Sequence, residues 1–249
     1  MPLRTDAASN TRATVYGFIP ARRGSKRVPG KNLTLVNGRP LIAYTIETAI
    51  RSGIFDHVIV NSEDDQILMA AREYGAETYR RPVALASDTT YVIEIIQEMV
   101  RTLRLPDTAV MGVLFPTCPL RAVEDIAEAY QLFRANGGST PVVSVTSYEY
   151  PIQLALDIGP DNRLEPAFPE DYRRSTRHND HKRMYRANFA IIFNIVGALR
   201  VQANLIGQRP IPYIMPQERA IDIDDPHQMW VVKTILESGA RLVEDHATP

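Results

Sequence analysis

Short apolar runs alternate with amphipathic segments through the first half of the chain. Residues 14–20 (TVYGFIP) and 57–61 (HVIVN) are rich in β-branched and aromatic side chains, which is typical of strands. Residues 109–115 (AVMGVLF) are continuously apolar, as expected of a strand that is buried on both faces. Apolar residues at helical spacing and terminal capping residues predict helices over residues 40–53, 62–74, 91–103 and 122–135.

This alternation of strand and helix favours right-handed βαβ units. We therefore predict an α/β fold, a Rossmann-like and mostly parallel sheet with helices on both faces. The pattern changes after Pro141, because residues 157–186 are polar and fit no regular element. We still expect strands over residues 142–146, 152–156 and 189–195, and a closing helix over residues 225–238.

This order of elements fits one domain with an insertion. Residues 14–249 are expected to form a single α/β domain. We interpret residues 141–186 as the insertion, serving as a lid, a substrate contact or a dimer arm. Residues 1–13 are interpreted as a frayed lead-in.

Composition narrows the class of protein. The 249 residues are 23% charged with a formal net charge of -1, which argues against a general binder of nucleic acids or membrane surfaces. The longest uncharged apolar stretches have 13 residues, whereas a membrane-spanning helix needs about 20. The N-terminus lacks the apolar core of a secretory signal, and one cysteine, Cys118, allows no intrachain disulfide. We expect a cytoplasmic protein.

A basic loop follows the first predicted strand. Between Pro20 and Asn32 there is no acidic residue, and glycines at 24 and 30 let backbone N–H groups turn toward an anion. Ligands of open parallel sheets bind at the carboxyl ends of strands, where this loop lies. It matches neither the Walker loop nor the dinucleotide fingerprint. The residues alone therefore indicate an anion site, with a solvated basic loop as the alternative.

Residues 19–32 (IPARRGSKRVPGKN) closely resemble the opening signature of CMP-sugar synthetases that act on nine-carbon acidic sugars. These are the N-acylneuraminate (sialic acid) cytidylyltransferases and their relatives for pseudaminic and legionaminic acids. Further segments resemble motifs of the same family, namely residues 81–89 (RPVALASDT), 115–121 (FPTCPLR), 188–192 (NFAII) and 222–224 (DID). The resemblance spans residues 15–236.

The resemblance implies transfer of CMP from CTP to the anomeric hydroxyl of the sugar, with release of pyrophosphate. Such a transfer depends on positioning and charge neutralisation more than on a covalent nucleophile. By the same resemblance Arg22, Lys31 and Asp222 are the expected catalytic residues. The expected nucleotide-binding residues are Arg22, Ser25, Lys26, Lys31, Asn32 and Arg81. Arg23 and Arg27 are interpreted as supporting electrostatics only.

Asp222 and Asp224 are the expected metal ligands. They are two residues apart, so on an extended segment their side chains point the same way. Two such carboxylates suit Mg²⁺, which also binds phosphate oxygens and water. The alternative is that Asp224 and Asp225 cap the helix that begins near Pro226. The resemblance favours Asp222 and Asp224 as ligands and Asp225 as the cap.

The acceptor is expected at residues 171–186, which carry six Lys or Arg against two Asp. A solvated face or an RNA site would also explain this charge, but the aromatic platforms of RNA readers are missing. The resemblance implies another role for this charge, namely binding the carboxylate of the sugar. Arg177 is its expected partner, and Gln153 and Asn188 are the expected polar sugar contacts. No spacing around His178 and His181 makes a zinc set.

Four positions depart from the sialic acid pattern. Phe115 replaces a glutamine, Phe189 a glycine, Ile192 a tyrosine and Cys118 a serine, which we interpret as a small core residue. A bulkier, less polar wall favours a deoxy sugar of the pseudaminic type, as do residues 150–153 and 175–180.

Two other functions stay open. One is an enzyme of the same fold with another acceptor, such as a CMP-KDO synthetase or another sugar nucleotidyltransferase. The other is a non-catalytic nucleotide-binding homologue, against which the intact basic loop and both carboxylates argue. Family analogy also suggests a homodimer in which the insertion reaches across.

Overall fold

A seven-stranded sheet in the order β11-β7-β10-β6-β1-β4-β5 forms the centre of the molecule. It is seen in a computed structural model that describes residues 12–239, so most of the expected lead-in lies outside the described residues. β10 pairs antiparallel with β6 and β7, and the other neighbouring strands pair in parallel. The strands are β1 (Val15–Pro20), β4 (His57–Ser62), β5 (Glu77–Arg80), β6 (Val110–Val113), β7 (Val142–Ser147), β10 (Tyr185–Ile195) and β11 (Ile211–Ile214). The predicted α/β class and mostly parallel sheet are confirmed.

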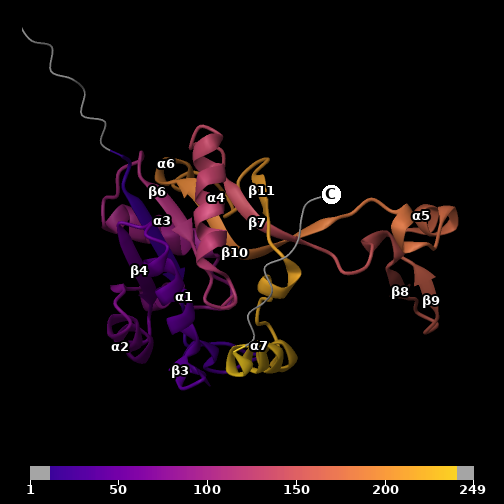
Figure 1. Cartoon of the computed structure of the whole chain (residues 1–249), viewed down its shortest axis with the longest axis horizontal. Coiled ribbons are helices and arrows are strands. Elements are labelled where there is room, and N and C mark those ends of the chain that lie inside the picture. The colour runs from indigo at the N-terminus through magenta and orange to yellow at the C-terminus, as the bar shows by residue number, and fades with distance from the viewer. Residues whose placement is uncertain (1–11, 240–249) are drawn as a thin grey trace, which may run out of the picture.

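Helices cover both faces of this sheet (Figure 1). α1 (Leu41–Arg51), α2 (Asp65–Glu73) and α4 (Val123–Ala135) pack on one face through residues such as Ile46, Ile67 and Phe133. α3 (Val92–Thr102) and the short α6 (Val196–Leu199) pack on the other. A third apolar cluster joins α7 (Pro226–Ser238) to the hairpin of β2 (Leu35–Val36) and β3 (Arg39–Pro40).

The apolar strands and helices that the sequence predicts are confirmed apart from differences at two of their boundaries and positions. Ser62 ends β4, and α2 starts only after Asp64, whose side chain accepts a hydrogen bond from the Ile67 N–H at 3.0 Å. The strand expected over residues 152–156 is wrong, because Ile152–Leu154 form a 3₁₀ turn and the next strand begins at Leu156.

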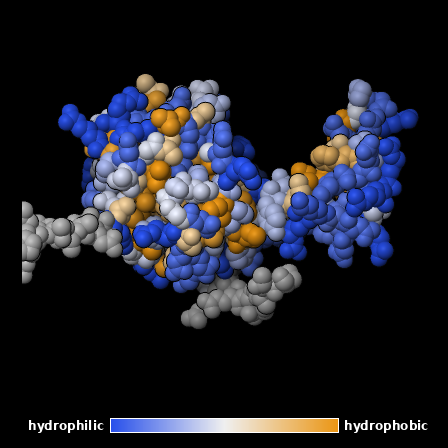
Figure 2. Space-filling model, turned by 90° about the horizontal axis from the view of Figure 1, so that it is seen from above, coloured by the Kyte–Doolittle hydropathy of each residue, from blue (hydrophilic) through white to orange (hydrophobic). Residues whose placement is uncertain are grey.

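An arm formed by residues 148–184 projects from the body between β7 and β10 (Figure 1). It contains β8 (Leu156–Ile158), β9 (Leu164–Pro166), α5 (Pro169–Arg174) and the 3₁₀ turn His178–Asp180. The expectation that residues 157–186 fit no regular element is therefore wrong, because short polar elements carry no apolar period. The three apolar core clusters of residues 12–239 include no side chain from the arm. Figure 2 shows a gap between arm and body, with apolar side chains on the arm surface that borders it.

Across residues 12–239, every helix is too short or too polar to cross a bilayer.

Candidate functional site

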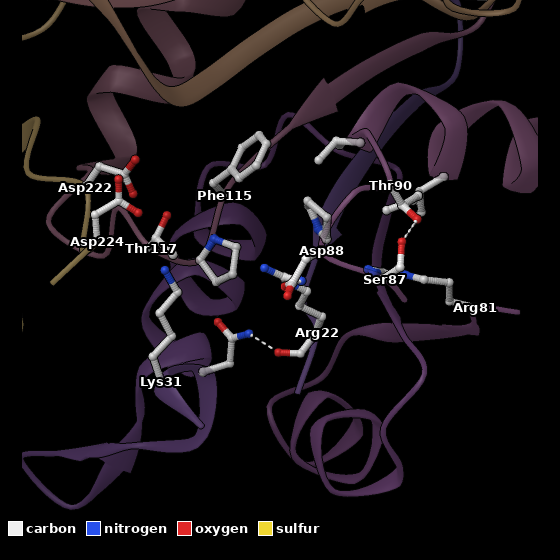
Figure 3. Close-up of a pocket in the computed structure, with 15 residues that line it drawn as sticks. Arg22, Lys31, Arg81, Ser87, Asp88, Thr90, Phe115, Thr117, Asp222 and Asp224 are labelled. Carbon is white, nitrogen blue, oxygen red and sulfur yellow. Dashed lines mark hydrogen bonds and ion pairs between the residues drawn. The ribbon is translucent and has the colours of Figure 1, made fainter. Parts of the chain in front are cut away.

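A cavity of about 290 Å³ opens at the carboxyl edge of the sheet. The loops that follow β1, β5 and β6 meet there with the segment between β11 and α7, as expected for the ligand edge of a parallel sheet. An adjoining hollow of about 300 Å³ lies against the basic loop and shares Arg22, Lys31, Asn32, Asp88 and Asp224 with the cavity. In Figure 3, Lys31, Thr117, Asp222 and Asp224 gather on one side, and Arg81, Ser87 and Thr90 on the other.

Two cations of the basic loop hold a carboxylate of the loop that follows β5. Lys26 Nζ lies 2.8 Å from Asp88 Oδ2, and the Arg22 guanidinium pairs with the other Asp88 oxygen. Hydrogen bonds from Lys26 and Arg22 lower the pKa of the Asp88 carboxyl. The Asp88 carboxylate therefore pairs with Arg22 and Lys26, the two cations that the resemblance assigns to the nucleotide phosphates.

Lys31 links the basic loop to the acidic segment. Its Nζ donates to the Ile223 carbonyl at 2.7 Å, between the two carboxylates that flank Ile223 in sequence. Burial lowers the pKa of the Lys31 ammonium, and the charges of Asp222 and Asp224 oppose that shift. Lys31 therefore lies beside both expected metal ligands.

Asp222 and Asp224 differ in their surroundings. Burial raises the pKa of the Asp222 carboxyl, with a smaller increase from Asp224, and its buried Oδ1 has no hydrogen-bond partner. Asp224 Oδ1 lies 3.0 Å from the Arg27 guanidinium. Asp225 caps α7, since its side chain accepts from the Gln228 N–H at 2.8 Å, which confirms the expected cap.

This donor set fits a magnesium ion that is shared with a nucleotide. An orphaned carboxylate oxygen on Asp222 and a second carboxylate two residues on are hard oxygen ligands of the kind that Mg²⁺ prefers. Among residues 12–239 no group of three or more His, Cys, Asp or Glu is arranged for a metal ion. Phosphate and water oxygens would have to complete the coordination.

Three other predicted nucleotide residues support the loop itself. Asn32 Nδ2 donates to the Arg22 carbonyl at 2.9 Å, and Ser25 Oγ accepts from the Val28 N–H at 3.4 Å. Arg81 is buried, where its Nε donates to Asn61 Oδ1 at 2.7 Å, and burial lowers the pKa of its guanidinium. All three lie at the cavity or its adjoining hollow.

The expected sugar contacts are not brought to the cavity of the same chain. Gln153 and Arg177 are on the arm, where Gln153 Nε2 donates to the Lys182 carbonyl at 3.0 Å. Asn188 is buried inside a bulge of β10, and its Oδ1 accepts from Ser144 Oγ at 2.5 Å. In this position Asn188 supports the bulge and does not line the cavity.

The bulge places an aromatic pair beside the site. Phe115 lines the cavity, and Phe189 contacts it with ring centroids 6.0 Å apart. Phe189 has a φ of 55°, which is the left-handed backbone conformation that residues other than glycine rarely adopt. The expectation that Ile192 belongs to this wall is wrong, because Ile192 is fully buried in the core. Cys118 is buried too, as expected of a core residue.

Buried Arg121 fastens the bulge to the body. Its guanidinium donates to the Ala190 carbonyl and, at 3.0 Å, to Thr45 Oγ1 of α1. Burial lowers the pKa of Arg121 to about 10.

Sequence reasoning missed three residues at the site. Asp88 and Thr117 lie inside motifs that carried the resemblance, and both line the cavity, so position within a motif was the available signal. Arg186 is the second residue of the antiparallel strand β10, opposite Thr146, which brings it to the same sheet edge, and its charge opposes the raised pKa of Asp222. Only the reversed direction of β10 places Arg186 there.

A mostly parallel sheet with a basic loop after its first strand and a carboxylate pair across the cavity defines an α/β nucleotidyltransferase. The family described as cytidylyltransferase matches residues 16–157. The chain belongs to this family, and we conclude that it is an enzyme of the nucleotidyltransferase class.

Relatives of known name and one solved structure agree with this assignment. A pseudaminic acid cytidylyltransferase of Campylobacter jejuni subsp. jejuni serotype O:2 is 32% identical over 88% of this chain and 94% of its own length. An N-acylneuraminate cytidylyltransferase of Escherichia coli O18:K1:H7 is 32% identical over 92% of this chain and 54% of its own length. The structure of a CMP:2-keto-3-deoxy-manno-octonic acid synthetase complexed with CTP has a TM-score of 0.66 at 16% identity, covering 92% of this chain and all of that one. At that identity it shows the shared fold.

Proposed function

We propose that this enzyme transfers CMP from CTP to the anomeric hydroxyl of a nine-carbon acidic sugar and releases pyrophosphate. The observation that carries the proposal is the cavity in which Arg22 and Lys31 face Asp222 and Asp224, with one buried carboxylate oxygen unpaired. Such a site neutralises a triphosphate and holds a divalent cation. The named relatives act on pseudaminic and N-acylneuraminic acids, which supports an acceptor of this class.

The residues divide the work of the reaction. The anomeric hydroxyl oxygen forms a bond to the α-phosphorus and gives up its proton to solvent. The bond between the α-phosphorus and the oxygen that bridges to the β-phosphate breaks, and pyrophosphate leaves. Arg22 and Lys26 are placed to neutralise the phosphates, and Lys31 stands between the basic loop and the carboxylates. Asp222 and Asp224 would hold Mg²⁺, which when bound would supply charge stabilisation at the phosphate of the transferred CMP.

Acceptor binding involves the base of the arm. Arg186 is exposed at the cavity edge of β10, and an arginine there can bind the sugar carboxylate bidentately. Arg177 serves the cavity of a second copy, because the arm carries it away from its own. We therefore propose a homodimer in which the arm reaches across.

A cytoplasmic location, suggested by the lone cysteine and by CTP as substrate, remains our expectation.

One assay tests the proposal. Pyrophosphate release is measured with CTP, Mg²⁺ and a panel of pseudaminic, legionaminic, N-acetylneuraminic and KDO acceptors. We expect turnover with a nine-carbon acid that exceeds turnover with the eight-carbon KDO. Turnover with KDO alone would make the enzyme a CMP-KDO synthetase, and CTP binding without turnover on any acceptor would favour a non-catalytic homologue.

A further inference from the structure

Asp125 is a buried carboxylate outside the cavity. It lies in the first turn of α4, directly after the turn that carries Thr117, and has no exposed surface. Its oxygens accept from the Ala122 N–H at 2.8 Å, from the Tyr213 hydroxyl at 2.9 Å, and from Arg219 Nε and Nη2 at 3.0 and 2.9 Å. A carboxylate buried so completely depends on such a full set of donors.

The donors tie α4 to the segment that carries the expected metal ligands. Tyr213 is in β11, and Arg219 ends the 3₁₀ turn Gln217–Arg219, three residues before Asp222. The two parallel bonds between Arg219 and Asp125 fix orientation as well as distance. The hydrogen bond to Asp125 also raises the pKa of the Arg219 guanidinium.

Other contacts hold the same segment further along. The Ile223 N–H donates to the Thr117 carbonyl at 2.9 Å, and Asp225 caps α7. The start of the segment is held by Arg219. Asp222 therefore sits between two fixed points, one at Arg219 and one at Ile223.

We propose that Asp125 is a positioning residue for the reaction. Through its ion pair with Arg219 it holds Asp222 and Asp224 where both carboxylates bind one divalent cation together with the nucleotide phosphates. This inference rests on the metal assignment of the proposed function. The Glu128 carboxylate, one turn later on α4, lies 2.9 Å from the same Tyr213 hydroxyl, whose single proton it shares with Asp125, but Arg219 forms its ion pair with Asp125, so Glu128 offers a matched comparison.

The experiment measures Mn²⁺ binding in the presence of CTP, by electron paramagnetic resonance of the free ion, and the Mg²⁺ dependence of pyrophosphate release. Asp125→Asn is expected to weaken Mn²⁺ binding roughly tenfold or more, as loss of a group that orients a metal ligand commonly does. Glu128→Gln is expected to leave the affinity for Mn²⁺ unchanged. Ile126→Val, a buried change beside Asp125, controls for lost stability.

The outcomes separate positioning from a purely structural role. If Asp125→Asn lowers the melting temperature as Ile126→Val does but keeps wild-type Mn²⁺ affinity, the inference is wrong. Should Asp125→Asn fail to fold, Arg219→Gln tests the same pair from its partly exposed partner, with the same expected loss of affinity. Wild-type protein that binds no Mn²⁺ with CTP would overturn the metal assignment itself, a result distinct from unchanged affinity in the variant.

Discussion

At the level of single residues, Asp222 carries the main energetic conflict of the site. Burial raises its pKa, so the folded protein disfavours the charged form that a metal ligand needs. Because the folded pKa lies above the unfolded one, stability from this group is full below the ordinary carboxyl pKa and is lost as pH rises through the folded pKa. At pH above the folded pKa, the metal-free protein therefore holds the Asp222 charge at a cost in stability.

We predict that Asp222→Asn stabilises the metal-free protein and removes most of its activity. The melting temperature at neutral pH should rise by roughly 1–4 °C if about 1 kcal/mol is recovered. Turnover should fall by roughly a hundredfold or more, since a carboxylate ligand is lost. Calorimetry and pyrophosphate release are the measurements.

The control for Asp222 is Asp224→Asn, whose carboxylate is about half exposed and paired with Arg27. This variant should lose turnover without gaining stability. The melting temperatures of the wild type and of Asp222→Asn should also converge at pH below 3.8, where the Asp222 carboxyl of the wild type is protonated in the folded and the unfolded state. Stability gained equally at acid pH would contradict the burial argument.

Asp88 gives a second prediction at this scale, because its carboxylate occupies Arg22 and Lys26. Asp88→Asn should free both cations for phosphate and lower the KM for CTP by about two- to fivefold, the range expected when an exposed ion pair no longer competes. Steady-state kinetics at low salt measures this change. Asp65→Asn, which removes an exposed carboxylate paired with Arg80 outside the cavity, should leave the KM unchanged. A higher KM in Asp88→Asn would instead make Asp88 a nucleotide contact.

At the level of elements, the sequence predicts what is apolar and periodic. β1 and β6 stand in the middle of the sheet, and their continuous apolar runs were sufficient to find them. The edge strands β5 (ETYR) and β11 (IPYI) were missed, because polar or exposed residues and a proline hide their period. The sequence also does not show strand register or strand direction. The antiparallel direction of β10 and its register with β7 are what bring Arg186 to the site.

The bulge of β10 could not be predicted either, because it is a change of strand register, and the sequence does not show register. The motif at residues 188–192 resembles a sugar-binding block, but a bulge turns Asn188 into the core and Phe189 toward Phe115. From Ala187 to Ile192 the chain advances five residues while its partner β7 advances two, and an odd number of extra residues reverses the side to which later side chains point. Ile192 therefore joined the core and not the wall.

This aromatic wall leads to a prediction about the acceptor. The wild-type enzyme should have a higher kcat/KM with a 5,7-diacylamino deoxy nonulosonate than with N-acetylneuraminate, by roughly tenfold or more if one hydrogen bond decides it. Phe115→Gln restores a polar side chain on the cavity surface and should reduce that ratio. Competition assays with CTP in excess measure the ratio. Ile192→Val, a conservative change at a buried residue behind the wall, should leave the ratio unaltered, and a wild-type preference for N-acetylneuraminate would refute the argument.

At the level of the whole molecule, the arm is the part whose side chains belong to none of the apolar core clusters of residues 12–239. Tyr150, Ile158 and Leu164 are exposed at 72%, 65% and 67%. Ile158 and Leu164 are paired across the β8–β9 hairpin, so they form one apolar surface. An apolar surface of this kind on a projecting element is typical of a protein interface.

We predict that the double variant Ile158→Asp, Leu164→Asp breaks the proposed homodimer. The wild type should sediment at about twice the chain mass of 28.0 kDa, because a second copy covers the arm. Burying two unpaired carboxylates in that interface should be prohibitive, so the variant should sediment as a monomer. Analytical ultracentrifugation at micromolar concentration measures the mass.

The comparison variant is Val83→Asp, Val201→Asp, which adds the same two charges at exposed apolar positions of the body. It should keep the wild-type mass, which separates an arm interface from a general effect of charge. Activity provides the second readout, since a cavity that depends on Arg177 from the partner's arm loses acceptor binding when the dimer dissociates. The KM for the sugar should then rise in the arm variant while the affinity for CTP, bound by the chain's own basic loop, stays near the wild-type value. A wild-type monomer that turns over the sugar at full rate would show that Arg186 alone serves the acceptor and that the arm has another use.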